Sequence, residues 1–229
     1  MTPTEKSIWI LIPAYNEAVA IEPVIRNLKT HGYDHILVVD DGSRDDTAAV
    51  ARTAGAEVLE HLINRGQGGA LQTGIDYLSE EYSPDIIITF DADGQHRPED
   101  IAALIRPIQD DQSDIVLGSR FLDPTSEIPP LRLLILKLGI LFTNIVSHIR
   151  LTDTHNGLRA MSRKAYQAIR ITHRGMEHAS DIIDEITRKN LRYTECPVTV
   201  IYSDYSKAKG QSSIGFIKMG CKLLLRKLM

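Results

Sequence analysis

The sequence predicts an α/β domain with a mostly parallel central sheet flanked by helices. Short runs of Val, Ile and Leu alternate with amphipathic segments over residues 7–118, and such alternation forms parallel sheets with right-handed crossovers. Polar residues follow these apolar runs directly, at the strand ends where open α/β sheets bind ligands. With 229 residues, of which 43% are hydrophobic, the chain can bury a sizeable core, so we expect one domain over residues 1–229.

The first half of the chain is predicted to alternate strictly between strands and helices. Its helical segments carry apolar residues at three- and four-residue spacing, and most of its strands end at Pro, Gly or Asp. Strands are expected at Ser7–Ile12, His35–Val39, Glu57–Leu62, the run from Ile86, and Ile115–Gly118. Helices are expected at Ala20–His31, from a cap at Asp46 or Thr47 to Ala54, at Gly68–Leu78, and from Pro98 to about Gln109.

After about residue 122 the regular alternation stops. An apolar helix is expected at roughly 130–149, and a short strand near Gly157–Met161. Helices around 163–169 and 177–189, a strand at Val198–Tyr202 and a basic amphipathic helix at the C-terminus complete the prediction.

Composition excludes several functional classes. The net charge of −4 gives no basic balance for nucleic-acid binding, although residues 203–229 hold six Lys or Arg against one Asp. The two cysteines, Cys196 and Cys221, do not make a disulfide framework and fit a reducing cytoplasm. No apolar signal segment follows Met1, and the stretch Leu131–Phe142 is too short to span a bilayer. We expect a cytoplasmic protein that at most lies on a membrane.

Two carboxylates, Asp91 and Asp93, follow the apolar run from Ile86. Side chains two residues apart on an extended backbone point the same way, so these two can converge. They would repel each other unless a cation lay between them, and Mg²⁺ prefers one or two carboxylates together with substrate phosphates. The alternative interpretation is that both are solvated acidic side chains of a turn. The residues at the neighbouring strand ends distinguish between the two interpretations.

Two other strand ends and one loop carry similar residues. The segments are Pro13–Glu17, Asp40–Ser43 and the glycine-rich stretch Asn64–Gly69, whose backbone N–H groups can face an anion at the start of a helix. Each segment alone has residues that are common in turns. Acidic turns that gather on one edge of a sheet repel one another unless a ligand or metal uses them, which favours a binding site.

These motifs, taken in order, resemble those of family 2 glycosyltransferases. The series includes Pro13-Ala14-Tyr15-Asn16-Glu17, Val39-Asp40-Asp41-Gly42-Ser43, Asn64-Arg65-Gly66, Asp91-Ala92-Asp93-Gly94-Gln95, Gly118-Ser119-Arg120-Phe121 and, less tightly, Asp153–Arg159. Within the family they are most similar to the dolichol/polyprenyl-phosphate sugar synthases. The resemblance implies a GT-A fold with a nucleotide-sugar-binding half at 1–121, an acceptor-side half at 122–212 and a basic helix at 213–229.

The resemblance also implies roles for individual residues. Asp91 and Asp93 would bind Mg²⁺ or Mn²⁺, which bridges the donor diphosphate, while Gln95 and Arg120 would bind phosphate oxygens. Asp93, Arg120 and Asp181 would form the catalytic set. The remaining donor-binding residues implied are Pro13, Tyr15, Glu17, Asp40, Asp41, Asn64, Gly66 and Ala92.

The acceptor is left open between a lipid phosphate and a saccharide hydroxyl. A hydroxyl acceptor needs a base, for which Asp181 or Glu177 on the helix around 177–189 are the candidates, whereas a phosphate needs none. A lipid phosphate could be met by Arg132 in the apolar helix, and Lys207 and Lys209 lie in a segment that resembles a basic loop of the relatives. The basic amphipathic tail suits an anionic membrane surface, and packing or oligomer formation is the alternative use of the apolar helix and the tail.

Other classes fit the sequence less well. A phosphatase with an Asp-x-Asp pair would carry it near the first strand, a nucleotidyltransferase would need a basic glycine-rich loop there, and a dehydrogenase would need Gly-x-Gly-x-x-Gly. The main prediction is a metal-dependent, inverting glycosyltransferase at the inner face of the membrane, alone or with a small membrane-protein partner or a second copy. A non-catalytic nucleotide-sugar-binding module is the alternative from another class.

Overall fold

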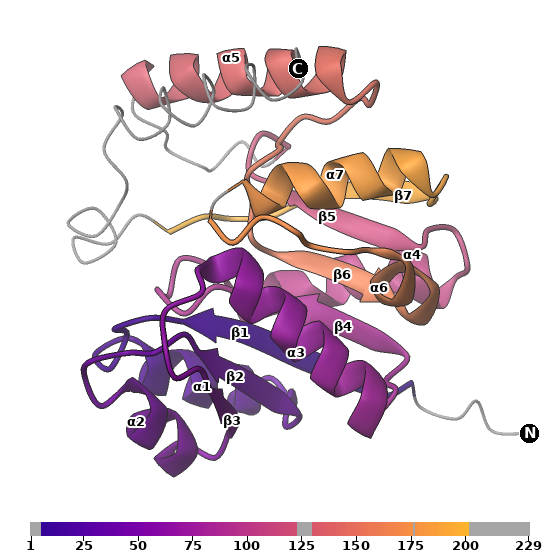
Figure 1. Cartoon of the computed structure of the whole chain (residues 1–229). Helices are drawn as coiled ribbons and strands as arrows, with labels where there is room; N and C mark the ends of the chain where they lie inside the picture. The colour runs from indigo at the N-terminus through magenta and orange to yellow at the C-terminus, as the bar shows by residue number, and fades with distance from the viewer. Residues whose placement is uncertain (1–5, 123–129, 176, 202–229) are drawn as a thin grey trace, which may run out of the picture.

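The structure is a computed structural model, and it describes residues 6–122, 130–175 and 177–201. A seven-stranded sheet runs through the molecule in the order β3-β2-β1-β4-β6-β5-β7 (Figure 1). Only β6 runs antiparallel to its neighbours, so the predicted mostly parallel α/β sheet is confirmed. The strands are β1 (Ile8–Ala14), β2 (Ile36–Asp40), β3 (Glu57–Glu60), β4 (Ile86–Thr89), β5 (Ile115–Ser119), β6 (Arg159–Ser162) and β7 (Tyr193–Pro197).

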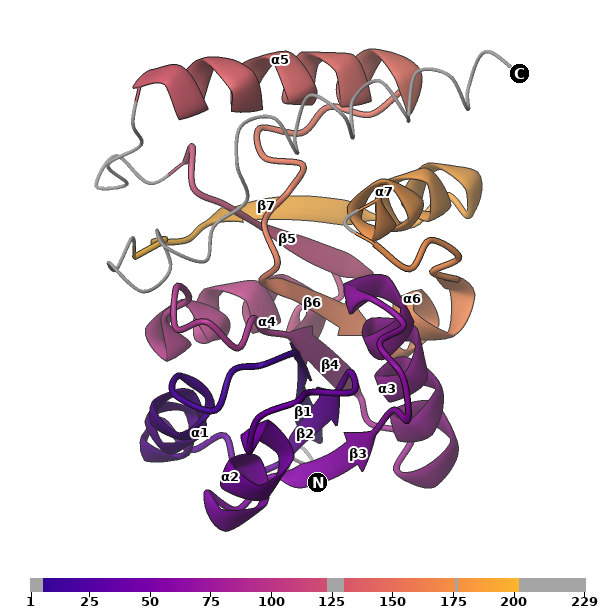
Figure 2. The ribbon, with the colours of Figure 1, turned by 60° about the vertical axis from the view of Figure 1, so that its left-hand side comes forward.

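Helices cover both faces of the sheet (Figure 2). The helices α3, α6 and α7 lie on one side, and α1, α2 and α4 lie on the other. Their bounds are α1 (Ile21–Thr30), α2 (Thr47–Thr53), α3 (Gln67–Glu81), α4 (Ile101–Gln109), α5 (Pro130–Val146), α6 (Arg163–Ala168) and α7 (His178–Arg188), with a short 3₁₀ turn at Pro98–Asp100. The sequence thus forms a three-layer α/β/α arrangement.

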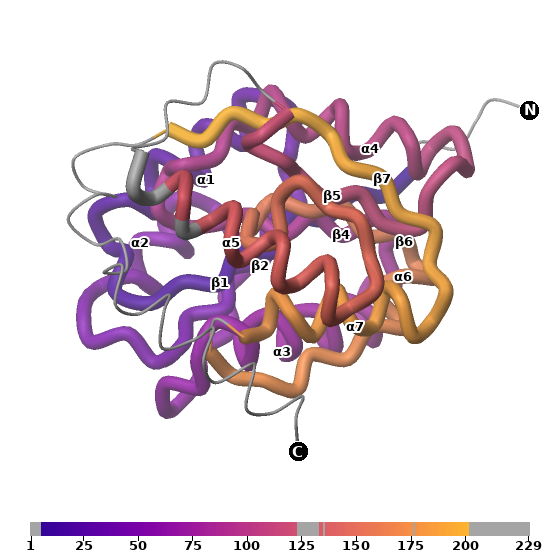
Figure 3. The backbone as a smooth tube through the Cα atoms, turned by 90° about the horizontal axis from the view of Figure 1, so that it is seen from above, coloured from indigo at the N-terminus to yellow at the C-terminus, as the bar shows by residue number. Residues whose placement is uncertain are grey.

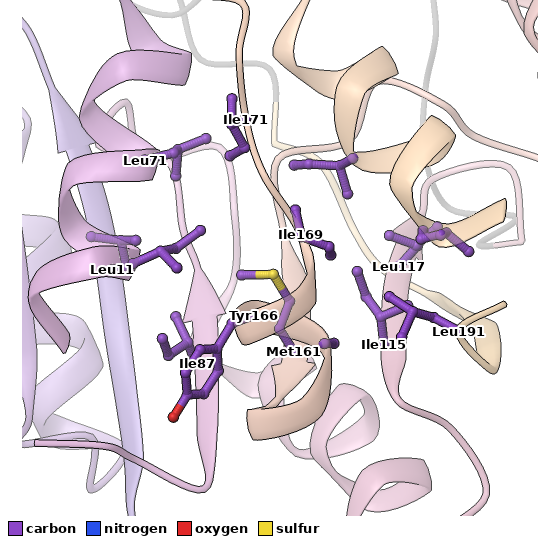
Figure 4. Packing of buried hydrophobic residues seen from close by; sticks show 14 of the residues in the cluster. Leu11, Leu71, Ile87, Ile115, Leu117, Met161, Tyr166, Ile169, Ile171 and Leu191 are labelled. Carbon is purple, nitrogen blue, oxygen red and sulfur yellow. The ribbon is translucent and has the colours of Figure 1, made fainter. Parts of the chain in front are cut away.

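Alternate residues of the strands supply the two cores between the layers. Leu11 of β1 and Ile87 of β4 face α3 and α6 in the first core, where they pack with Leu71 and Tyr166 (Figure 4). Ile10 and Ile12 of β1 point to the other face and pack with residues of α1 and α4. Because successive strand side chains point to opposite faces, a continuous apolar strand is buried on both sides, which explains the runs in the sequence.

The strand order places a crevice beside β1. The chain passes from β1 to β2 and β3 in one direction and then returns to place β4 on the other side of β1. Such a reversal opens a crevice at the carboxyl ends of the strands, where α/β proteins bind ligands. Ala14 pairs with Asp40 and Leu11 pairs with Thr89, so the turns after β1, β2 and β4 meet there.

The antiparallel strand β6 brings a different part of the chain to the same edge. The strands β4 and β5 run in the opposite direction to β6, so β6 begins where they end. Its first residue, Arg159, pairs with Thr89 of β4 and with Leu117 of β5. The segment before β6, residues 153–158, therefore lies next to the turn after β4. This arrangement connects the first half of the chain to the second half across the crevice.

The strand predicted at Val198–Tyr202 is wrong. The last strand is β7, which pairs with β5 from Tyr193 to Pro197. The apolar run after it leaves the sheet and crosses the carboxyl end of β5, where Val198 N donates to Ser119 O at 3.1 Å and Ile201 N donates to Gln95 O at 2.9 Å. The apolar side chains at 198 and 200 are buried there without a strand partner.

Helix α5 lies past the β7 edge of the sheet, nearest the viewer in Figure 3. Its outer face carries Leu134, Leu138, Leu141 and Ile145, each between 57% and 63% exposed, whereas Leu136 is buried. Within the described residues, no helix is long and apolar enough to cross a membrane. The basic helix predicted at 213–229 and the candidate side chains of Lys207 and Lys209 lie outside the described residues.

Candidate active site

A cavity of about 490 Å³ opens at the carboxyl ends of the strands. Turns after β1, β2 and β4 line one side of it, and residues of β6, α7 and the turn after β5 line the other. Many residues proposed from the sequence meet in this one cavity. They are Pro13, Tyr15, Glu17, Asp41, Asn64, Gly66, Asp91, Ala92, Asp93, Gln95 and Arg120.

Asp91 is held by two side chains of the cavity. His96 Nε2 lies 2.9 Å from its Oδ2, and Gln67 Nε2 donates to its Oδ1 at 3.1 Å. Burial opposes ionisation of Asp91, but the hydrogen bond and charge of His96, aided by Arg159, hold its pKa below the ordinary value. The carboxylate is therefore charged at neutral pH and fixed in orientation.

Asp93 lies beside this fixed charge. Its Oδ1 accepts a hydrogen bond from Gln95 N at 3.0 Å. Burial is the main cause that raises the pKa of Asp93 to about 6, and repulsion from Asp91 is the second. Two neighbouring carboxylates in a partly enclosed cavity are a suitable oxygen donor pair for Mg²⁺ or Mn²⁺, because the cation would relieve their repulsion. Substrate oxygens would have to complete the coordination, since the described residues hold no group of three or more His, Cys, Asp or Glu that could bind a metal.

Asp41 organises the glycine-rich loop. Its Oδ1 lies 2.7 Å from His61 Nδ1 and accepts from Arg65 N at 2.8 Å, while its Oδ2 accepts from Gly66 N at 2.6 Å. Gly66 has a φ of +80°, a backbone conformation that residues with a Cβ rarely adopt. The carboxylate thus fixes the loop that leads into α3, and it also lines the cavity.

A short segment, Thr172–Gly175, packs against this loop, and its last residue lines the cavity. Arg174 O accepts a hydrogen bond from Gly68 N at 2.9 Å. A Cβ on Gly68 would lie 2.0 Å from His173 O, so only glycine permits this approach. We call residues 172–175 the strap.

Asp181, one of the two candidate bases in the sequence, anchors the strap. Its carboxylate accepts from the backbone N–H groups of Thr172 and His173, both at 2.7 Å, and lies 2.6 Å from His173 Nδ1. Burial works against the charge, but the hydrogen bonds from His173 and Thr172 keep the pKa of Asp181 below its ordinary value. Asp181 is not among the residues that line the cavity. Its geometry therefore fits an anchor better than a base.

Arg120 reaches the cavity as part of a buried ion pair. Its Nε donates to Asp153 Oδ2 at 2.6 Å, and its backbone N donates to the same atom at 3.2 Å. Asp153 also accepts from His155 N at 3.2 Å. The pair fixes the guanidinium at the cavity wall, at the end of β5.

Two other predicted residues have different surroundings. Asp40 is buried beneath the turn after β2, accepts hydrogen bonds from the side chain and backbone of Ser43, and does not line the cavity. Burial, only partly offset by these bonds, raises its pKa. Arg132 lies in the first part of α5.

Sequence reasoning did not assign a role to five polar residues of the cavity: Gln67, His96, His155, Arg159 and His178. Burial lowers the pKa of both His155 and His178 to about 4, so each is neutral at neutral pH. His96 stands three residues after Asp93, and this proximity was a usable signal. Gln67, His155 and Arg159 lie within segments that the sequence analysis had singled out, whereas His178 depends on where α7 lies in the fold.

Comparisons with known proteins agree with this arrangement. A sequence model described as glycosyl transferase family 2 matches residues 9–170. A UDP-N-acetylglucosamine–dolichyl-phosphate N-acetylglucosaminyltransferase of Methanococcus voltae is 35% identical, over 98% of this chain and 97% of the relative. An undecaprenyl-phosphate mannosyltransferase of Micrococcus luteus is 30% identical, over 90% of this chain and 88% of the relative.

A solved structure has the same fold. Glucosyl-3-phosphoglycerate synthase from Mycobacterium tuberculosis, crystallised with Mn²⁺, UDP and glucosyl-3-phosphoglycerate, superposes with a TM-score of 0.73. The match covers 97% of this chain and 78% of that chain at 19% identity, so it bears on the fold alone. The fold is of the GT-A type. From the family match and the two relatives, this chain belongs to glycosyl transferase family 2 and is a glycosyltransferase.

Proposed function

We propose that this glycosyltransferase moves a sugar from a nucleoside-diphosphate donor to a polyprenyl phosphate, with inversion at the anomeric carbon. One observation carries the proposal: the cavity brings together two neighbouring carboxylates and two guanidinium groups. Asp91 and Asp93 lie after β4, whereas Arg120 and Arg159 reach the cavity from β5 and β6. Such a cavity suits a cation and two phosphate-bearing substrates.

The donor occupies the side formed by the first half of the chain. The turn with Pro13, Tyr15 and Glu17 holds the base and ribose, together with the loop fixed by Asp41. Asp91 and Asp93 would hold a divalent cation, which would supply positive charge to the departing nucleoside diphosphate. The loop at Asn64 and Gly66 completes the donor side.

The acceptor approaches from the side of α5. A phosphate oxygen of the acceptor attacks the anomeric carbon, the bond from that carbon to the donor diphosphate breaks, and the nucleoside diphosphate leaves. Because a phosphate is already an anion, the step needs no base. This matches the surroundings of Asp181, whose carboxylate is occupied by the strap. A saccharide hydroxyl would need a base, and the carboxylate of Asp181 is committed to the strap.

The outer face of α5 suits a lipid acceptor. Leu134, Leu138, Leu141 and Ile145 recur at spacings of four, three and four, so they share one face of the helix. Leu136 points away from them and lines the cavity. One helix thus borders both the cavity and an exposed apolar stripe, an arrangement that would bring a membrane-bound polyprenyl phosphate next to the donor. The protein would act peripherally at the inner face of the membrane.

Purified protein tests the donor assignment. Binding to the folded state alone raises the melting temperature, so UDP-, GDP- and dTDP-sugars are compared with Mn²⁺ and without it. We expect one nucleotide class to stabilise the protein, and only when Mn²⁺ is present. Stabilisation by none of the nucleotide sugars, or equal stabilisation without any divalent cation, would contradict the donor assignment.

Vesicle sedimentation tests the membrane face. We expect Leu138→Ser and Leu141→Ser to weaken binding to vesicles that contain anionic lipid, and deletion of residues 214–229 to do the same. Leu62→Ser is the matched control, because Leu62 is fully exposed at 101% and lies in the first half of the chain, away from α5. If the α5 variants bind vesicles as well as wild type does, the stripe is not a membrane-binding face, and oligomer formation becomes the explanation for it.

A further inference from the structure

Arg159 is a buried cation that the proposed donor and cation sites do not use. It is the first residue of β6, only 4% of it is exposed, and it lines the cavity. Its Nη1 has no hydrogen-bond partner in the described structure. Two other buried side-chain nitrogens, His96 Nδ1 and Asn156 Nδ2, share this property there, but neither belongs to an arginine or lysine.

The charges around Arg159 do not use its full hydrogen-bonding capacity. Asp91 and Asp153 both attract it electrostatically. The carboxylate of Asp91 is engaged by His96 and Gln67, and that of Asp153 by Arg120 and the backbone of His155. Burial outweighs these attractions and lowers the pKa of Arg159, although the guanidinium stays protonated. An unpaired N–H of a charged group is costly unless a ligand accepts from it.

The neighbouring histidines add no positive charge beside Arg159. His155 and His178 line the cavity and are neutral at neutral pH, since burial lowers the pKa of each to about 4. Neutral imidazoles can donate one N–H and add no positive charge beside the arginine. The charge that faces a ligand on this side therefore comes from Arg159 and from Arg120, which is paired with Asp153.

We propose that Arg159 binds a phosphate oxygen of a substrate, through the N–H of Nη1 that has no partner within the protein. The inference rests on the proposed function and adds a specific anion-binding residue to it. A guanidinium offers a planar pair of N–H donors that match phosphate oxygens, which a lysine at this position would not. The phosphate belongs either to the donor diphosphate or to the acceptor, and two probes separate these sources.

The test measures binding rather than turnover. Isothermal titration is run with UDP and GDP, each with Mn²⁺, for the donor and with farnesyl phosphate for the acceptor. The variants are Arg159→Gln and Arg159→Lys, and the matched control is Arg163→Gln, an exposed arginine four residues further along. Circular dichroism and melting temperature first establish that each variant is folded.

We expect Arg159→Gln to weaken one of the two probe classes about tenfold or more and Arg163→Gln to change neither, as a charge-assisted bond predicts. Weaker nucleotide binding assigns the arginine to the donor, and weaker farnesyl phosphate binding assigns it to the acceptor. Arg159→Lys keeps the buried charge and is expected to fall between wild type and Arg159→Gln. If Arg159→Gln does not fold, Arg159→Lys is the variant that tests the proposal, and we then expect it to weaken probe binding roughly threefold.

Two results overturn the proposal, and they can be told apart. If wild type binds a probe and the folded Arg159 variants bind both classes as tightly as wild type does, the arginine has no role in phosphate binding, while the proposed function stands. If wild type binds none of the probes, the proposed function fails and this inference fails with it.

Discussion

His96 Nε2 lies 2.9 Å from Oδ2 of Asp91, so a buried imidazole holds one of the two carboxylates proposed to bind the cation. The ring packs edge-on against Phe90, with ring centroids 5.5 Å apart. Partners that orient a metal ligand commonly affect affinity almost as much as the ligand itself. We therefore expect His96→Ala to weaken Mn²⁺-dependent nucleotide binding by roughly 10- to 100-fold. Titration of UDP or GDP with Mn²⁺ measures this, with His31→Ala, a histidine at the C-terminal end of α1 that does not line the cavity, as the control.

Asp181→Asn separates an anchor from a base. An amide keeps the shape of the side chain but loses the charge that accepts from the strap, so we expect a loss of about 2 kcal/mol in the free energy of unfolding. The KM for the donor should rise because the strap closes against the loop at Gly66. Urea unfolding and steady-state kinetics check both effects. Loss of kcat with unchanged stability and unchanged donor KM would instead identify Asp181 as the base.

Gly68→Ala tests the contact between the strap and α3. The added Cβ would lie 2.0 Å from His173 O and 2.7 Å from His178 Cβ, so the strap has to move. Overpacking of this kind costs about 1–3 kcal/mol, and donor binding should weaken at the same time. Gly139→Ala is the control, because its nearest described neighbour is 3.9 Å away and alanine favours a helix. If the two variants bind donor equally well, the strap does not shape the site.

Asp114 gives a pH-dependent contribution to stability. Arg192 and Lys164 contact its carboxylate at 2.8–3.0 Å, and although burial opposes the charge, these contacts lower its pKa from 3.8 to about 2. The folded-state pKa lies below the unfolded value, so the contribution is fully present above pH of about 4 and is lost as the pH falls toward about 2. We expect Asp114→Asn to lose about 1–2 kcal/mol at neutral pH, with allowance for solvent near Lys164. Urea unfolding near pH 3 should show a smaller difference from wild type, and an equal difference at both pH values would contradict this.

The sequence was enough to predict the acidic side of the cavity. Asp91, Asp93 and Gln95 follow a buried apolar run, and Asp41 follows another, so the parallel sheet alone brings them to one edge. Local pattern and topology agree here, which is why the α/β class and most elements of the first half were predictable.

Arg120 was predicted from the sequence as a phosphate-binding residue and does line the cavity. The position of Arg159 was not predictable, because it depends on pairings between distant parts of the chain. Arg159 reaches the cavity because β6 lies antiparallel between β4 and β5 in the sheet. The partners of the Asp181 side chain depend on where residues 172–175 lie, and helical spacing in the sequence does not reveal this. The last strand was placed five residues too late because Val198–Tyr202 is the more apolar run, whereas pairing with β5 selects Tyr193–Pro197.

The most direct test of the central claim is a transfer assay that follows sugar from the donor identified by thermal shift into a polyprenyl phosphate, with mass spectrometry of the lipid product. The proposed function predicts product with wild type and Mn²⁺, and background levels with EDTA. Asp93→Ala should also give only background product, because this change removes one of the two carboxylates that hold the cation. Near-wild-type transfer by Asp93→Ala would contradict the claim that this pair anchors the donor diphosphate.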